Sequence, residues 1–129
     1  MNAAVRRYTM GKKEEAAKRH GSGLSCSQAV YCAYHDVTGK SEQESAKIAA
    51  PYSGGRKVKC GAVLGAELVL QDLYGNDAAD KIAELERIFT EKNQSVNCLE
   101  LRGAAGGPKL RSCRGCVEDA AEILESILA

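Results

Sequence analysis

Six of the 129 residues are cysteines, and these are the residues of the chain best suited to chemistry. A deprotonated cysteine sulfur is both the nucleophile of thiol–disulfide exchange and a soft metal ligand. In a reducing cytoplasm, where structural disulfides are rare, a set of cysteines indicates metal binding, catalysis or redox sensing. The position of each sulfur on the predicted helices separates reactive cysteines from ordinary core cysteines.

Cys113 and Cys116 form a CxxC pair. Both sulfurs lie within the first turn of a predicted helix, the usual placement of a dithiol that cycles with a disulfide. Val117 stands where attachment of a c-type haem requires histidine. A second close pair, typical of four-cysteine zinc sites, and the ferredoxin spacings are both missing from the sequence. The pair by itself therefore favours a reversible disulfide.

Four cysteines occupy predicted helix starts. Three of these follow a residue that can cap a helix: Cys26 after Ser25, Cys98 after Asn97 and Cys113 after Ser112. The fourth, Cys60, follows the glycine-rich segment 51–59. The first turn of a helix carries unpaired N–H groups and about half a positive charge, so we expect each of these thiols to have a lowered pKa. Cys32 falls in mid-helix and is expected to be a core residue.

The elements that position these sulfurs are all predicted to be helices. No segment alternates with period two, whereas apolar residues recur at helical spacing along most of the chain. Capping residues, glycines and Pro51 divide the chain into helices over about 3–19, 26–38, 41–50, 60–74, from Asn76 or Asp77 onward, after Asn97, and 112–128. We predict an all-α fold: one compact domain, 1–129, of about five to seven helices, with 1–20 as a possible peripheral helix and 21–129 as the cysteine-containing core.

The composition argues against several classes of function. A net charge of +1, aromatics at 5 % and the absence of Trp make nucleic-acid binding unexpected. No apolar run is long enough to span a membrane, and the first residues lack the apolar core of a signal peptide, so we expect a cytoplasmic protein. The loop RGAAGGPK lacks the Lys–Ser/Thr ending of a phosphate-binding P-loop. Among the other residues, His20 and His35 are expected at the surface. Gly61 and Gly65 would let a ligand or another backbone approach the Cys60 sulfur, or would allow close helix packing, and we favour packing.

Four blocks of the sequence resemble the C_GCAxxG_C_C family of redox-active proteins of anaerobic bacteria and archaea. The blocks are GSGLSCSQAV, SGGRKVKCGAVLGAELVL, CLELRG and CRGCVEDAAEIL, in the family's order and spanning about residues 20–128. The resemblance implies that Cys26, Cys60, Cys98 and Cys113 are the family cysteines. The family's GCA reads CGA here, and Cys116 is an addition. Relatives also occur beside multihaem and iron–sulfur proteins, which implies that a cluster is an alternative.

Three hypotheses follow. In the leading one, a thiol–disulfide oxidoreductase without a cofactor, Cys113 and Cys116 form a reversible disulfide. Cys26, Cys60 and Cys98 then act as a relay or second pair, and the partner is a redox protein or a small thiol. In the second, Cys26, Cys60, Cys98 and Cys113 hold an iron–sulfur cluster or zinc. In the third, the chain is a partner-binding bundle whose cysteines are incidental. A homo-oligomer is compatible with all three.

Overall fold

The computed structural model describes residues 11–53, 57–104 and 106–129. These residues form eight α-helices and two short 3-10 turns, and their extended pairing is limited to one isolated bridge between Lys59 and Asn97. The helices are α2 Lys12–Gly21, α3 Cys26–Ala33, α4 His35–Thr38, α5 Glu42–Ala49, α6 Gly61–Tyr74, α7 Ala79–Asn93, α8 Cys98–Arg102 and α9 Cys113–Leu128. The predicted all-α fold is confirmed.

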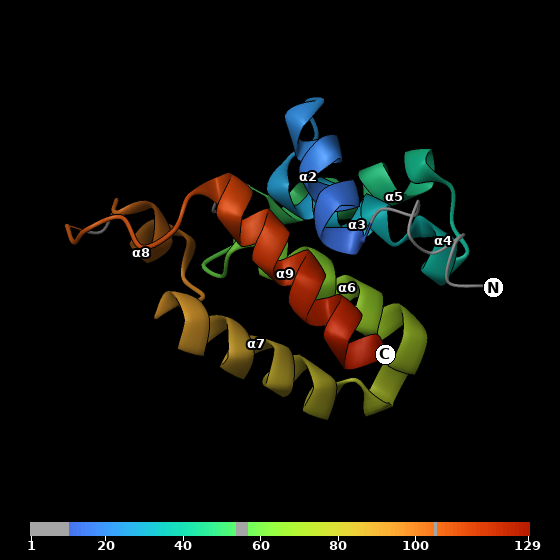
Figure 1. Ribbon diagram of the computed structural model, residues 1–129. Coiled ribbons are helices and arrows are strands. Elements are labelled where there is room, and N and C mark those ends of the chain that lie inside the picture. The colour runs from blue at the N-terminus through green and yellow to red at the C-terminus, as the bar shows by residue number, and fades with distance from the viewer. Residues whose placement is uncertain (1–10, 54–56, 105) are drawn as a thin grey trace.

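The last helix, α9, crosses in front of α6 and holds the bundle together (Figure 1). It packs against α2, α3, α6 and α7, while α3 packs along α6. The apolar stripe of α9 is buried in this arrangement through Val117, Ala120, Ala121 and Leu124, as its helical spacing predicts. Since α3, α6 and α9 all meet, their N-terminal residues can approach one another at one end of the bundle.

Small residues bring α3 and α6 close together. A Cβ atom on Gly65 would lie 2.6 Å from the carbonyl oxygen of Ser27, a distance that real side chains do not tolerate. Glycine at this position therefore lets the backbones of the two helices touch. The prediction that Gly65 serves close packing is confirmed.

The capping residues predicted for three cysteine-bearing helices are confirmed. The side chains of Ser25, Asn97 and Ser112 each accept a hydrogen bond from the backbone N–H three residues later, at the starts of α3, α8 and α9. Ser41 does the same for α5. Such caps are worth about 1 kcal/mol each and fix the residue at which a helix begins. They therefore fix the place of the cysteines that follow them.

Three details differ from the sequence-based expectations. The N-cap of α7 is Ala78, whereas the sequence predicted a start at Asn76 or Asp77. Residues 75–77 form a 3-10 turn that leads directly into α7, so no residue with extended backbone precedes the helix. The second predicted helix is split at Tyr34, whose hydroxyl donates to the carbonyl of Ala121 at 2.8 Å. This split makes eight α-helices in the described ranges, where five to seven were expected.

The N-terminal part of the first predicted helix, residues 3–10, lies outside the described residues. The described part, α2, buries Ala16 and Ala17 against α3 and α9. None of the helices in the described ranges is both long and apolar enough to cross a lipid bilayer.

Candidate functional site: a cavity lined by five thiols

Five of the six cysteines line one cavity of about 140 Å³ at the meeting point of the helix starts. We call it the thiol cavity, and its lining comprises Cys26, Cys60, Cys98, Cys113 and Cys116 together with Gly61, Leu101, Arg102 and Arg111. Every cysteine predicted as a site residue is therefore part of it. Residues that are up to 90 positions apart in the chain meet here because α3, α6, α8 and α9 begin around the same point.

A short backbone pairing places Cys60 beside Cys98. The N–H of Cys60 donates to the carbonyl of Val96 at 2.6 Å, and the N–H of Cys98 donates to the carbonyl of Val58 at 3.0 Å. These bonds flank the bridge between Lys59 and Asn97. Since α6 and α8 begin directly after this pairing, it fixes both helix starts at the same side of the cavity.

Gly61 allows Cys26 to reach the start of α6. A Cβ atom at this position would collide with the Cys26 sulfur and would lie 2.9 Å from the carbonyl oxygen of Tyr52. The sequence favoured a packing role for both glycines of this helix. At Gly61 the packing partner is itself a site sulfur, so the glycine serves the site directly.

The sulfurs contact one another across helices. Cys116 on α9 interacts with Cys60 at the start of α6, which lowers the pKa of Cys60 and raises that of Cys116. Cys113 interacts in the same way with Cys26 at the start of α3, which raises the pKa of Cys113. These contacts join different helices, whereas the sequence predicted a disulfide within the CxxC pair.

The pKa of Cys60 is lowered, as its place at a helix start predicts. The hydrogen bond from Cys116 is the largest cause and outweighs the opposing effect of burial. The N–H groups of Ala62 and Val63 in the first turn of α6 add to the shift. Cys60 itself is the N-cap residue, one position before the helix, and its side chain makes no ideal capping hydrogen bond.

The expectation of a lowered pKa is wrong for Cys98 and Cys113, whose pKa values are raised. Burial is the main cause for Cys98, and the hydrogen bond to Cys26 is the main cause for Cys113. The pKa of Cys116 is raised in the same way by its hydrogen bond to Cys60. Sulfurs that share a cavity cannot all ionise, because each thiolate repels the next and is stabilised by a neighbour that keeps its proton.

His20, expected at the surface without a role, lies at the edge of this site. Its Nε2 atom is 3.6 Å from the Cys113 sulfur. Cys113 is the exposed member of the five thiols. The two residues are 93 positions apart, and their contact depends on how α2 packs against α9, so no local spacing in the sequence announces it.

Cys32 stands apart from the site, as expected for a mid-helix residue. It is fully buried, its thiol donates to the carbonyl of Glu42 at 3.6 Å, and burial raises its pKa. This cysteine provides a natural internal control for experiments on the other five.

The metal alternative finds limited support in the geometry. Its four proposed ligands, Cys26, Cys60, Cys98 and Cys113, do share the thiol cavity. However, across residues 11–53, 57–104 and 106–129 no three His, Cys, Asp or Glu side chains are grouped so that they could hold a metal ion. The cysteine sulfurs are suitable soft ligands for zinc or iron, but they are not grouped closely enough around one point to coordinate an ion.

A family model described as "Putative redox-active protein (C_GCAxxG_C_C)" matches residues 24–127. The chain belongs to this family. No curated protein and no solved structure shows a significant match to it. The match covers α3 to α9 almost completely, and with them all five thiols of the cavity. In this member of the C_GCAxxG_C_C family the pattern cysteines lie on separate helix starts, and the fold brings them together.

Proposed function

We propose that this protein exchanges its own thiols for disulfides with a disulfide substrate. The observation that carries the proposal is the single cavity lined by five cysteines, one of them exposed, in which Cys113 neighbours Cys26 and Cys116 neighbours Cys60. Each contact holds two sulfurs ready to join after the loss of two electrons and two protons. Exposure of Cys113 gives the substrate its point of entry.

The first step takes place at Cys113. Its sulfur attacks one sulfur of the substrate disulfide RSSR, forms a mixed disulfide and releases one RS⁻. The Cys26 sulfur then attacks the Cys113 sulfur, closes the Cys26–Cys113 disulfide and releases the second RS⁻. The substrate has gained two electrons and ends as two RSH, which take up the two protons that the cysteines lose.

His20 supports this step as a proton acceptor. In the tautomer that carries its proton on Nδ1, the Nε2 atom can accept the single hydrogen of the Cys113 thiol across the 3.6 Å contact when that thiol turns from Cys26 to His20. Attack requires the thiolate, and Cys113 carries a raised pKa. A neighbouring base therefore matters more for Cys113 than for the thiolate-forming Cys60.

The second pair accepts the oxidation from the first. The Cys60 thiolate attacks the Cys26–Cys113 disulfide, and Cys116 then resolves the intermediate. The products are a Cys60–Cys116 disulfide and two regenerated thiols, with no net change in electrons. Cys60 suits this role because its pKa is lowered, and its burial protects the resulting disulfide from solution thiols. The raised pKa of Cys98 favours its remaining a thiol.

The test is oxidation of the folded protein, prepared without oxygen, by the neutral hydroxyethyl disulfide, followed by thiol counting and disulfide mapping. We expect reversible loss of four thiols and the pairs Cys26–Cys113 and Cys60–Cys116. The variant Cys26→Ala should stop at a mixed disulfide on Cys113. The control Cys32→Ala should behave as the parent, because Cys32 lies outside the thiol cavity.

Three results would overturn the proposal. One is that all six thiols stay inert. Another is that a Cys113–Cys116 disulfide forms alone, which would return the chemistry to the CxxC pair. The third is one equivalent of iron or zinc per chain in the anaerobic preparation, with the five thiols protected from alkylation until a chelator removes the metal.

A further inference from the structure

We propose that the disulfide substrate is a small anionic molecule whose carboxylates are bound by Arg102 and Lys109 beside Cys113. This inference rests on the proposed disulfide exchange and names the chemical class of its substrate. It is carried by a second hollow next to the thiol cavity and by the charges that line it.

The second hollow has a volume of about 440 Å³ and is lined by Arg102, Ala104, Lys109 and Cys113. We call it the entry groove. It shares Arg102 and Cys113 with the thiol cavity, so a molecule in the groove lies against the exposed sulfur. The volume falls within the range of about 300–1,000 Å³ that is usual for small-molecule sites.

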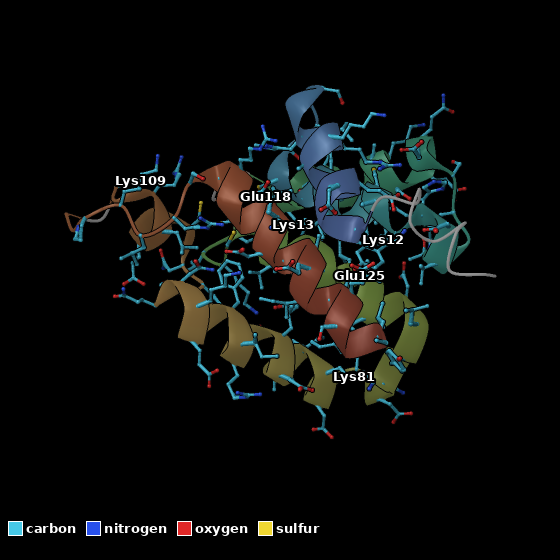
Figure 2. All side chains as sticks on the ribbon, viewed as in Figure 1. Lys12, Lys13, Lys81, Lys109, Glu118 and Glu125 are labelled. Atoms are coloured by element: carbon cyan, nitrogen blue, oxygen red, sulfur yellow. The ribbon has the colours of Figure 1, made fainter. Side chains whose placement is uncertain are left out.

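The backbone that carries both cations is fixed by local contacts, and the two side chains are exposed. Arg102 is the last residue of α8, and Gly103 follows it with a φ of 77°. A Cβ atom on Gly103 would lie 2.9 Å from the backbone nitrogen of Lys109, so glycine lets the returning chain pass directly beside the helix end. The N–H groups of Leu110 and Arg111 then donate to the carbonyl of Leu101 at 3.0 and 3.1 Å. Lys109 is thereby fixed at the α8 end of the molecule (Figure 2).

The charges of the entry groove are not neutralised within the described part of the chain. No ion pair found there involves Arg102 or Lys109, and no acidic residue lines either hollow. The acids carried by α9 nearby are already engaged: Glu118 with Arg114 at 3.6 Å, and Asp119 with Lys92 and Arg111, both at 3.0 Å. Two unmatched cations at an opening attract an anion and repel a cation.

The electrostatics also suit the chemistry of the step. A dicarboxylate disulfide enters as a dianion, and cleavage releases a further negative charge as RS⁻. Arg102 lies in the wall of both hollows, and its positive charge opposes the rise in the pKa of Cys98. A cation in the same hollow as Cys113 stabilises the leaving thiolate as well as the bound carboxylate.

The experiment compares three disulfides that differ mainly in charge: dithiodipropionate (anionic), hydroxyethyl disulfide (neutral) and cystamine (cationic). The initial rate of thiol loss for each is divided by its rate with a small neutral thiol in the same buffer. At low ionic strength we expect dithiodipropionate to be favoured over cystamine by about tenfold, with the preference shrinking as salt is added. The double variant Arg102→Gln with Lys109→Gln should bring that ratio close to one.

Lys81→Gln is the matched control, because it removes one positive charge from a lysine that lies on α7, away from Lys109 (Figure 2). It should keep the preference, and Lys109→Gln should reduce it. If all three disulfides oxidise the protein with equal normalised rates, the inference is wrong while the exchange reaction stands. If hydroxyethyl disulfide oxidises no thiols, the proposed function itself fails. A preference that survives in the double variant would also overturn the assignment of these two residues.

Discussion

At the scale of single residues, Cys60 and Cys113 each have one of the two properties of a reactive thiol, a lowered pKa and exposure to solvent. Cys60 has the lowered pKa but is buried, while Cys113 is exposed but holds its proton. The helix starts alone would have made them alike, because each lies in the field of unpaired N–H groups. Their sulfur neighbours make the difference: Cys60 accepts a hydrogen bond from a thiol, and Cys113 donates one.

The thiol of Cys116 is therefore expected to control the reactivity of Cys60. A neighbouring donor favours the charged form of a thiol. In Cys116→Ala the pKa of Cys60 should rise, whereas Cys116→Ser keeps a donor and should give a smaller rise. The measurement is the pH profile of Cys60 alkylation, read by mass spectrometry. An unchanged midpoint in Cys116→Ala would show that the helix N–H groups alone stabilise the thiolate.

The same shift links Cys60 to stability. Because its folded pKa lies below that of the unfolded chain, its contribution is complete above about pH 8.5 and disappears as pH falls through the folded pKa. Cys116→Ala should reduce this pH-dependent part of the free energy of unfolding.

His20 should govern the reactivity of Cys113. Replacing it with Gln removes the base next to the sulfur, so alkylation of Cys113 near neutral pH should slow by about three- to tenfold, and its pH profile should change shape. His35→Gln serves as the control, because His35 lies on α4 and not in the thiol cavity. If Cys113 is alkylated at the same rate in both variants, His20 does not act as a base for Cys113.

At the scale of elements, the sequence predicts what is local. Ser25, Asn97 and Ser112 cap their helices because a cap depends on residues within one turn. The pairing of Cys26 with Cys113 and the contact of His20 with Cys113 were not predictable in this way. They depend on how α2 and α3 pack against α9, and many crossings satisfy the same apolar spacing.

Gly61 connects helix packing with the site, and a methyl group there should disturb both. In Gly61→Ala the new Cβ would displace the Cys26 sulfur and press on the Tyr52 carbonyl, at a cost of about 1–3 kcal/mol. We expect slower closure of the Cys26–Cys113 disulfide, with the mixed disulfide on Cys113 accumulating. Gly65→Ala should destabilise the fold similarly through Ser27 with less effect on closure.

Gly21→Ala is the neutral comparison for these two variants, because nothing lies within 4 Å of a Cβ at Gly21. Thermal unfolding measures the stability of all three, and time-resolved disulfide mapping measures closure. If the Cys26–Cys113 disulfide closes at the same rate in Gly61→Ala and Gly65→Ala, Gly61 has no special role at the site.

Helix α6 also carries a buried acid, Glu67, which is 7 % exposed. Burial and the nearby Glu86 raise its pKa to about 8, although Lys59 lies 3.2 Å away. Lys59 is the bridge residue directly before Cys60, so this cluster supports the pairing that positions two site cysteines.

A raised carboxyl pKa stabilises the fold most below the pKa of the unfolded chain, and that contribution is lost as pH rises through the folded value. The parent protein should therefore lose about 1–3 kcal/mol of unfolding free energy between about pH 5 and 8, relative to Glu67→Gln. Chemical denaturation at several pH values measures the difference. Glu84→Gln, at an exposed position on α7, should show the same pH dependence of unfolding free energy as the parent. If Glu67→Gln also shows the parent's pH dependence, the pKa of Glu67 is not raised.

At the scale of the whole molecule, the thiol cavity is also the place where the bundle can be cross-linked. A Cys26–Cys113 disulfide would tie α3 to α9, and a Cys60–Cys116 disulfide would tie α6 to α9. The reduced protein holds these helices mainly by packing, through a core of mostly small and branched residues such as Ala29, Val63 and Ala120. The redox state of the cavity and the stability of the fold are therefore coupled.

Oxidation should make the folded protein markedly more resistant to unfolding. The Cys26–Cys113 loop spans about 87 residues, and closing a loop of that length stabilises by about 2–4 kcal/mol through the restricted unfolded chain. A Cys113–Cys116 disulfide closes a loop of about four residues and contributes much less. Comparing the denaturant midpoints of the reduced and oxidised protein therefore distinguishes the two pairings.

The variant Cys113→Ser should lose most of the gain in stability on oxidation that depends on Cys26. The control Cys32→Ala should keep the full difference in stability between the oxidised and reduced protein. An oxidised protein no more stable than the reduced one would place the disulfide within one helix turn, and the cross-helix contacts would then not be the redox pairs.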